Sequence, residues 1–500
     1  MSIHAQLSEE ALQALQRQKR NSTISSIVIA ALTIALIFLI LGLFLLDNYV
    51  RETPTIVTYA ATLDEEQQLD ERKVTTQLQR QPASPSSAQA KVIAASTASP
   101  TAIPVPEIEV TTPSAEFGDT DDFGTGFGDA DVTGGGFSGI PSTMRRRCSP
   151  EDRVARLRET GGTPPQKVED AVERGLEWLQ NTQKDDGSWG GRPWMVADTG
   201  FGLLSYLGRC ETPMSPKYGA NVLKAITYLV DVGMENEGRL TKTQTNRQWP
   251  YEHSIATYAL AEAYTFCKQL DINIPNLEET VKRAGQFIID HQNNNGGWAY
   301  NYQRQGGHVD SSVSVWQLQA LKALEYTGIE FDGLVRSAQR GLSYIENLQA
   351  DSGGFGYRNT GHPGGARQGY FTMTGGCVLS LQLWGKGNST AVRRGASYIE
   401  EHSRFEYNSP YSDLLGLYYE SQAMLNRGGE QWRKYNEMFR DDLLAAQNTD
   451  GSWKTPNQGT GKPIRAVGSQ FVGNVHYRTC LAILTLENYY RFLPGTGGAR

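Results

Sequence analysis

The sequence predicts an all-α protein in which six helix pairs form an (α/α)6 toroid, preceded by one transmembrane helix and a disordered linker. Three observations lead to this prediction. One residue pattern recurs six times after about residue 154, the second helix of each copy is apolar on most faces, and an uncharged apolar segment lies near the N-terminus. An open superhelical solenoid is the alternative arrangement for such a repeat.

Composition limits the function classes. The 500 residues include 47 Lys and Arg against 54 Asp and Glu, and the resulting net charge of −7 argues against a nucleic-acid partner. Hydrophobic residues make up 39%, below the usual ~45–50%, as expected when a disordered segment dilutes a globular domain. The five cysteines include no C-x-x-C pair, which excludes a zinc ribbon and a disulfide-dense scaffold.

The first expected element is a membrane anchor. Residues 1–23 form a cytoplasmic N-terminal segment, and residues 24–46 carry no charge over a length of about 34 Å as a helix. Arg17, Lys19 and Arg20 precede the apolar run, so the positive-inside rule places the N-terminus in the cytoplasm. We therefore expect a single-pass protein of the inner (cytoplasmic) membrane, with its toroid domain periplasmic or otherwise extracytoplasmic. A cleaved signal peptide is the alternative, although the run exceeds the usual h-region.

The second expected element is a linker over residues 47–150. It is rich in Pro, Ser and Thr, then in Gly, Asp and Phe, and it has no sustained apolar periodicity. Such a segment cannot bury enough apolar area to offset its ordering entropy. We expect a solvated tether, with docking of a partner through its Phe-Gly pairs as the alternative.

The third element is the repeat domain over residues 151–500. The full pattern is a basic residue, a small residue, an aromatic residue, then Gln and a Gly-x-aromatic group, and the copies follow at a spacing of roughly 45 to 60 residues. The last copy has Leu444 at the aromatic position, and two weaker copies keep only Lys224-Ala225 with Tyr228 and Arg394-Gly395 with Tyr398. The clearest Gln, Gly and aromatic sets are Gln183, Gly187 and Trp189; Gln292, Gly296 and Trp298; Gln349, Gly353 and Phe355; and Gln447, Gly451 and Trp453. The glutamines can bond turn backbones and the aromatic residues can pack between neighbouring outer helices.

The second helix of each copy is expected on the inside. The six segments read ADTGFGLLSYLG, EHSIATYALAEAYTFC, VDSSVSVWQLQALKAL, MTGGCVLSLQLWG, YSDLLGLYYESQAML and HYRTCLAILTLENYY. A helix that is apolar on most faces belongs inside a helical assembly, whereas the amphipathic first helices belong outside. Cys210 and Cys267 end two of the inner helices, and we expect buried free thiols there, with a mutual disulfide as the alternative.

These repeats resemble those of squalene–hopene cyclases and protein prenyltransferase beta subunits over about 350 residues. The segments GGTPPQKVEDAVERGLEWLQ and GGEQWRKYNEMFRDDLLAAQNTDGSW are also similar to uncharacterised membrane-anchored terpene-cyclase-like repeat proteins of planctomycetes and related bacteria. The resemblance implies the toroid fold and the anchored topology. It implies no established activity.

The cyclase resemblance implies a catalytic acid. These cyclases protonate their substrate with the middle Asp of an Asp-x-Asp-Asp run at the head of an inner helix, and the matching place here is His308-Val309-Asp310-Ser311. Asp310 matches the acid itself, and His308 can partly replace a supporting acid. Ser311 stands where the last acid belongs. A literal Asp-x-Asp-Asp at residues 119–122 lies in the linker, outside any helical context.

The prenyltransferase resemblance implies a zinc site whose ligands have changed. Ser312 stands where a Cys ligand belongs, and Arg478 stands where a His ligand belongs. An Arg cannot bind zinc. We therefore expect neither a metal nor another cofactor.

Polar residues lie at the heads of all six expected inner helices. We expect most of them to cap the helices, because Asp, Ser, Thr and Asn are preferred N-caps. The alternative is a shared ligand-binding rim, formed by Asp198, Glu252, His253, Asp413, His476 and Tyr477. A metal set of His253, His308, His476 and Asp310 is a further alternative. Six aromatic residues either line the lumen or pack between helices: Trp249, Tyr251, Trp298, Tyr300, Trp316 and Tyr477.

The sequence favours a non-catalytic toroid that binds a lipid, a peptide or a glycan, because both known catalytic sets are incomplete. The first alternative is an isoprenoid cyclase with Asp310 as general acid. The second is another enzyme that uses the polar rim, such as an envelope hydrolase. The membrane, through residues 24–46, is the expected partner.

Overall fold

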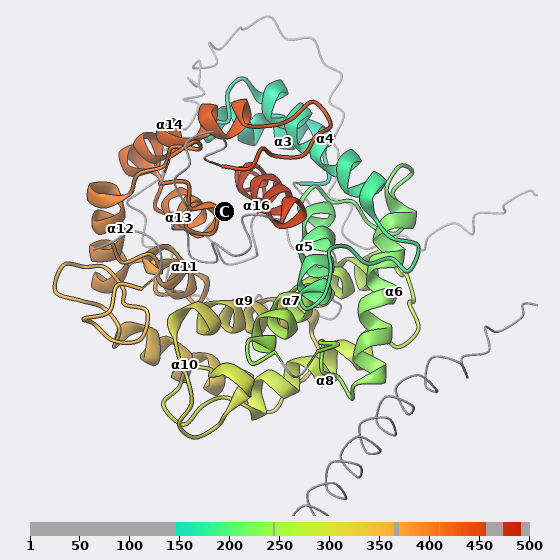
Figure 1. The fold of residues 1–500 in the computed structure, drawn as a ribbon, viewed down its shortest axis with the longest axis horizontal. Helices are drawn as coiled ribbons and strands as arrows, with labels where there is room; N and C mark the ends of the chain where they lie inside the picture. The colour runs from blue at the N-terminus through green and yellow to red at the C-terminus, as the bar shows by residue number, and fades with distance from the viewer. Residues whose placement is uncertain (1–146, 244–245, 365–369, 410, 457–473, 492–500) are drawn as a thin grey trace, which may run out of the picture. The chain divides into compact units, whose positions relative to one another are not determined.

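A computed structural model describes residues 147–491, apart from residues 244–245, 365–369, 410 and 457–473 (Figure 1). Contacts divide the chain into two units, Met1–Glu107 and Ile108–Arg500, and every described residue belongs to the second. The predicted segments at 1–23 and 24–46, and the linker up to residue 146, lie outside the described residues. In the described part, no helix is both long enough and apolar enough to span a bilayer.

The described residues contain helices and isolated β-bridges, without strands, so the predicted all-α class is confirmed. A short helix, α3 (Pro150–Glu159), comes first. The outer helices are α4 (Pro165–Thr182), α6 (Gly219–Glu235), α8 (Leu277–Asp290), α10 (Leu334–Glu346), α12 (Thr390–His402) and α14 (Gly429–Ala445). The inner helices are α5 (Met195–Gly208), α7 (Trp249–Gln269), α9 (Ser311–Thr327), α11 (Thr374–Leu383), α13 (Leu414–Arg427) and α16 (Val475–Glu487). A single 3-10 turn, η1 (Tyr300–Tyr302), precedes α9.

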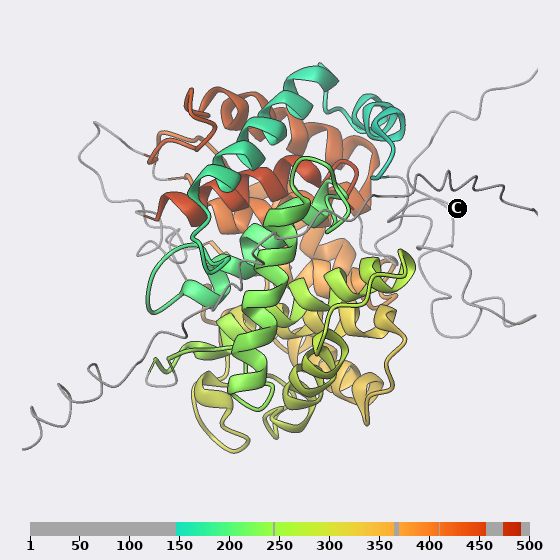
Figure 2. The same ribbon diagram turned by 90° about the vertical axis from the view of Figure 1, so that its right-hand side faces the viewer.

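The six inner helices form a closed cycle of contacts. Helix α5 packs on α7, α7 on α9, α9 on α11, α11 on α13, α13 on α16, and α16 again on α5. Figure 1 shows these helices enclosed by the six outer ones, and Figure 2 shows the outer helices from the side.

Burial separates the two sets of helices as the apolar patterns predict. Every residue of α11 is buried, whereas α8 buries one face, consisting of Leu277, Thr280, Val281, Ala284, Gly285 and Ile288. The inner helices therefore form the core, and the outer helices cover it with one apolar stripe each.

The repeated Gln joins each outer helix to the next. The side-chain amide of Gln292 donates to Gly296 O at 2.6 Å and to Ser337 O of α10 at 2.8 Å. Gln447, in the last copy, donates to Gly451 O at 3.0 Å and to Ala171 O of α4 at 2.8 Å. The last copy is thus bonded to the first in the same way as neighbouring copies are bonded to each other, and the predicted structural role of the glutamines is confirmed.

The repeated Gly is required by backbone geometry. Gly451 has a φ of +93°, and a Cβ there would lie 2.1 Å from Arg174 O. Gly187, Gly296 and Gly353 repeat both features at the equivalent turns. A side chain is excluded because the turn adopts left-handed φ and touches the backbone of the adjacent outer helix.

The segment before α3 is bound into the domain. Cys148 forms a disulfide with Cys210, so the prediction of a free thiol at Cys210 is wrong. Cys148 lies in a stretch whose composition indicates a linker, so the sequence did not point to this pairing. Cys267, Cys377 and Cys480 are buried free thiols, as expected for Cys267.

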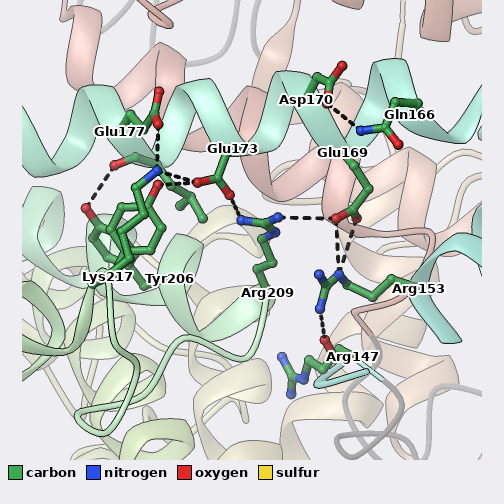
Figure 3. A network of polar contacts seen from close by, with 12 residues as sticks. Arg147, Arg153, Gln166, Glu169, Asp170, Glu173, Glu177, Tyr206, Arg209 and Lys217 are labelled. Carbon is green, nitrogen blue, oxygen red and sulfur yellow. Dashed lines mark hydrogen bonds and ion pairs between the residues drawn. The ribbon is translucent and has the colours of Figure 1, made fainter. Parts of the chain in front are cut away.

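Arg147 and Arg209, the residues that precede the two cysteines, belong to a network of ion pairs, and Figure 3 shows the part of it along α4. Arg147 Nη1 lies 2.6 Å from Glu262 Oε1 of α7, and both side chains are inaccessible to solvent. Glu169 of α4 pairs with Arg153 at 3.2 Å and with Arg209 at 3.4 Å, and Arg209 also pairs with Glu173. The network connects α3, α4 and the C-terminal end of α5.

Candidate functional site

A cavity of about 190 Å³ lies between the first turns of the inner helices. Its wall is mostly apolar, and eight of its fifteen residues are aromatic. The lining comprises Trp194, Ala197, Asp198, Phe201, Gln248, Tyr251, Ile255, Tyr300, Ser312, Trp316, Tyr357, Met373, Leu415, Tyr419 and Tyr477. Small-molecule sites are typically apolar and aromatic with few polar groups, which is the composition of this wall.

Asp310 lies behind the wall at the head of α9. It is fully buried, and its Oδ1 accepts hydrogen bonds from Val313 N at 3.0 Å and Ser312 Oγ at 2.6 Å. The bond from Val313 makes Asp310 the N-cap of α9. His308 Nε2 lies 3.0 Å from Asp310 Oδ2, so the two residues of the predicted catalytic pair are in contact.

A chain of hydroxyl groups connects Asp310 to the cavity. Ser312 Oγ, which bonds Asp310, lies 2.5 Å from the Tyr251 hydroxyl, and both residues line the wall. Tyr357, also in the wall, places its hydroxyl 3.4 Å from His308 Nε2 and 3.2 Å from the Tyr300 hydroxyl. Ser311 takes no part, since its hydroxyl donates to the carbonyls of residues 356 and 357. The buried carboxyl thus reaches the cavity through hydroxyls.

Asp198 of α5 is a second carboxyl group, and it forms part of the wall. Asn474 Nδ2 lies 3.3 and 3.2 Å from its two oxygens. Burial raises the pKa of Asp198 to about 7, against the opposing effects of Asn474 and the Gly191 backbone. Burial also raises the pKa of the neighbouring Glu252 to about 8, and Glu252 accepts from Thr241 Oγ1 at 3.0 Å behind the wall.

The two buried histidines have structural partners. His253 Nδ1 accepts from Leu240 N at 2.9 Å, and its Nε2 lies 3.1 Å from Ala284 O. His476 Nε2 lies 2.7 Å from Asp198 O. Burial lowers the pKa of His253 to about 3 and that of His476 to about 4, so both rings are neutral at pH 7.

The described part of the chain holds no group of three or more His, Cys, Asp or Glu side chains close enough to bind a metal ion. The two positions that correspond to prenyltransferase zinc ligands, Ser312 and Arg478, also have different surroundings. Ser312 lines the cavity, whereas Arg478 lies 3.4 Å from Trp453 O through Nε and Nη2.

Helix capping accounts for only some of the polar residues at the N-terminal ends of the inner helices. Asp310, Asp413 and Asn474 accept from backbone N–H groups as N-caps, and the Asp413 bond goes to Gly416 N at 2.9 Å. Asp198 and Glu252 do not cap, because α5 begins after Trp194 and α7 begins after Gln248. Of the predicted rim, Asp198 and Tyr477 line the cavity, whereas Glu252, His253, Asp413 and His476 do not.

Sequence reasoning identified half of the aromatic wall. Tyr251, Tyr300, Trp316 and Tyr477 line the cavity as one of the two alternatives anticipated. Trp298 instead packs behind α9, where its indole donates to Ile288 O at 2.9 Å. Trp194, Phe201, Tyr357 and Tyr419 were missed; Phe201 and Tyr419 follow other wall residues by one helical turn, which was an available signal.

No protein-family model matches this chain, and no curated protein matches it. Among solved structures, the chain is similar to the type II terpene cyclase MstE from Scytonema. The complex of an MstE variant with the substrate geranylgeranyl dihydroxybenzoate is 12% identical, covers 65% of this chain and 97% of its own, and has a TM-score of 0.41. The apo enzyme is 10% identical, with coverages of 64% and 98% and a TM-score of 0.42.

Proposed function

We propose that the repeat domain is an (α/α)6 toroid that binds an isoprenoid chain in the aromatic cavity and cyclises it by proton transfer from Asp310. One observation carries this proposal: the cavity wall is mostly apolar, and eight of its fifteen residues are aromatic. A peptide or a glycan would require paired polar groups along the wall, because each unpaired donor or acceptor costs desolvation energy. A polyene requires none, and aromatic faces stabilise the cations that form during its cyclisation.

The geometry around Asp310 supports its role as the acid. The carboxyl group lies out of water beside His308, and the hydroxyls of Ser312 and Tyr251 connect it to the wall. When Asp310 carries the proton, the bond to Ser312 runs in the other direction: the carboxyl donates to Ser312 Oγ, and the Ser312 and Tyr251 hydroxyls each pass on their own proton, so that Tyr251 delivers one to a terminal alkene of the substrate. His308 and Ser312 position the carboxyl, and Tyr300 and Tyr357 close the wall around it.

A non-catalytic isoprenoid-binding domain is the second candidate. The observation that favours it is the capping bond from Val313 N to Asp310, which gives the carboxyl a structural purpose without chemistry. Both candidates share the same cavity and the same ligand class.

The experiment uses the full-length protein in detergent, incubated with squalene and separately with a linear C20 polyprenol, and analyses extracts by gas chromatography and mass spectrometry. We expect a product of unchanged mass that contains rings, and its loss in Asp310→Asn. Glu420→Gln is the matched control, because Glu420 is a buried carboxyl outside the cavity lining that accepts hydrogen bonds from Tyr370 and Tyr435. Bound polyene with no cyclic product would favour the non-catalytic candidate.

We further propose that residues 24–46 anchor the domain to the inner membrane, with the domain on the extracytoplasmic side. The Cys148–Cys210 disulfide supports this topology, since disulfides persist in oxidising compartments. Protease treatment of spheroplasts should remove the domain without lysis. Protection until lysis would place it in the cytoplasm.

A further inference from the structure

Asp198 is a buried carboxyl group of the cavity wall that the proposed proton donor does not use. It is 3% exposed and lies in the first turn of α5. Gly190 closes over it so tightly that a Cβ at Gly190 would lie 1.8 Å from Asp198 Oδ2. The local chain therefore holds the carboxyl in place between the glycine turn and the cavity.

Few groups of the protein stabilise a negative charge on the Asp198 carboxylate. Among the described residues, Asp198 forms no ion pair, and it does not cap α5. Its polar partners are Asn474 and the Gly191 backbone. A buried carboxylate without a cation is costly, so a structural role alone does not explain an acid here.

Aromatic rings lie beside Asp198 in the wall. Phe201 is one turn further along α5, with its ring centroid 5.5 Å from that of Trp316 and 5.4 Å from that of Tyr477. All three rings line the cavity. A carboxylate together with aromatic faces is a site for an apolar cation, because both attract positive charge and neither hydrates it.

We infer that the Asp198 carboxylate faces the positive charge that a ligand carries in the cavity and accepts the proton that ends the cyclisation. This inference rests on the proposed function. Asp310 donates a proton to a terminal alkene, whose electron pair forms the new C–H bond and leaves a carbocation. After ring closure, the last cation loses a proton from the adjacent carbon to Asp198, and that C–H pair becomes a C=C bond. The net reaction is an isomerisation, and solvent returns the proton from Asp198 to Asp310.

The ionisation of Asp198 depends on groups from each neighbouring element. Glu252 approaches from α7, and Asn474, His476, Tyr477 and Cys480 approach from α16, while Lys184 acts from the turn after α4. Burial outweighs Asn474 and Lys184 and raises the pKa of Asp198 to about 7. The carboxylate therefore forms as pH rises through neutrality, within the range of a binding experiment.

The test compares two probes on the full-length protein: farnesyldimethylamine, which is an ammonium ion at pH 8, and the hydrocarbon in which CH replaces its NH⁺. Binding is followed by tryptophan fluorescence, since Trp194 and Trp316 line the cavity. We expect the wild type to bind the ammonium at least about tenfold more tightly at pH 8, and to lose this preference toward pH 5. Asp198→Asn should lose most of this preference and its dependence on pH, with only the attraction of the aromatic faces remaining, whereas Glu420→Gln should keep the preference.

The outcomes separate this inference from the proposed function. Hydrocarbon binding with an undiminished ammonium preference in Asp198→Asn would overturn the inference and leave the proposed function standing. Failure of the wild type to bind either probe would overturn both. Thermal unfolding of Asp198→Asn shows whether the variant is folded, and retained hydrocarbon binding shows that its cavity is intact.

Discussion

Asp198 and Glu252 make the stability of the domain depend on pH in an unusual direction. Burial raises the pKa of Asp198 to about 7 and that of Glu252 to about 8, whereas ordinary values are about 3.9 and 4.3. Between pH 4 and 8 the folded state binds more protons than the unfolded state at these groups. Their contribution to the free energy of unfolding is therefore fully present below about pH 4 and is lost as pH rises through the folded pKa values.

We therefore predict that urea denaturation gives a free energy of unfolding that decreases from pH 6.5 to pH 8, by at most about 1.4 kcal/mol per pH unit for each group. In Asp198→Asn the slope should be shallower. His253 and His476, with lowered pKa values, act in the opposite sense only below about pH 6.5. An unchanged slope in the variant would show that Asp198 titrates normally.

Two substitutions at Asp310 can separate its role as a helix cap from its proposed role as the proton donor. Asn caps a helix about as well as Asp, so Asp310→Asn should change stability by a few tenths of a kcal/mol, whereas Asp310→Ala should cost about 0.5–2 kcal/mol. An amide cannot donate the catalytic proton, so Asp310→Asn should lose turnover with unchanged substrate binding. Denaturation curves and product analysis of both variants check this. Turnover by Asp310→Asn would remove Asp310 from the chemistry.

The sequence predicts some residues of the site and misses others for a physical reason. The contact between Asp310 and His308 follows from a contiguous motif, while their catalytic role stays a prediction. Ser312, which links Asp310 to the wall, is noticed only as a lost zinc ligand. Tyr357 lies in a loop without periodicity, so its approach to His308 depends on tertiary packing that spacing does not encode.

At the level of elements, the turn glycines are the most sensitive positions of the repeat. In Gly451→Ala, left-handed φ costs roughly 1–2 kcal/mol, and the methyl group would meet Arg174 O. We predict a loss of more than about 1 kcal/mol in the free energy of unfolding. Gly361→Ala is the control, because a Cβ at Gly361 would have Asn359 Oδ1 at 3.6 Å as its nearest contact. Equal effects of the two substitutions would contradict this account.

The helices themselves follow closely from the sequence. The period of apolar residues separates the inner helices from the outer ones, and the Gln and Gly positions mark the turns. The two weaker copies still form α6 and α12, because Tyr228 and Tyr398 remain buried in them. Helix starts are less predictable: Asp198 lies inside α5, since Trp194 precedes the first turn and no side chain caps it.

At the level of the whole molecule, closure joins residues that are far apart in the chain. Gln447 bonds Ala171, Trp432 Nε1 bonds Thr160 O at 2.7 Å, and Asn474 bonds Asp198. A sixfold repeat predicts that the last copy lies beside the first. It does not predict the ion pairs, because pairs such as Arg147–Glu262 follow no period in the sequence. The charges and the disulfide thus remain outside what composition and spacing predict.

The folded domain extends to the N-terminal side of the boundary that composition indicates. Composition places the boundary at residue 151, yet Arg147 and Cys148 are bound into the network at α5 and α7. A protein that starts at residue 151 would lose a disulfide that closes 62 residues, worth about 2–4 kcal/mol, and would leave Glu262 with Arg491 as its remaining ion-pair partner in the described structure. We expect it to melt several degrees below a protein that starts at residue 147.

The matched control separates the two causes. Cys148→Ser with Cys210→Ser in the longer protein removes the disulfide and keeps Arg147. It should melt between the two truncated proteins, because it retains the buried Arg147–Glu262 ion pair that the protein starting at residue 151 lacks. Calorimetry of all three under oxidising conditions decides the point. Identical melting temperatures would mean that the segment before residue 151 contributes nothing to the fold, despite its buried side chains.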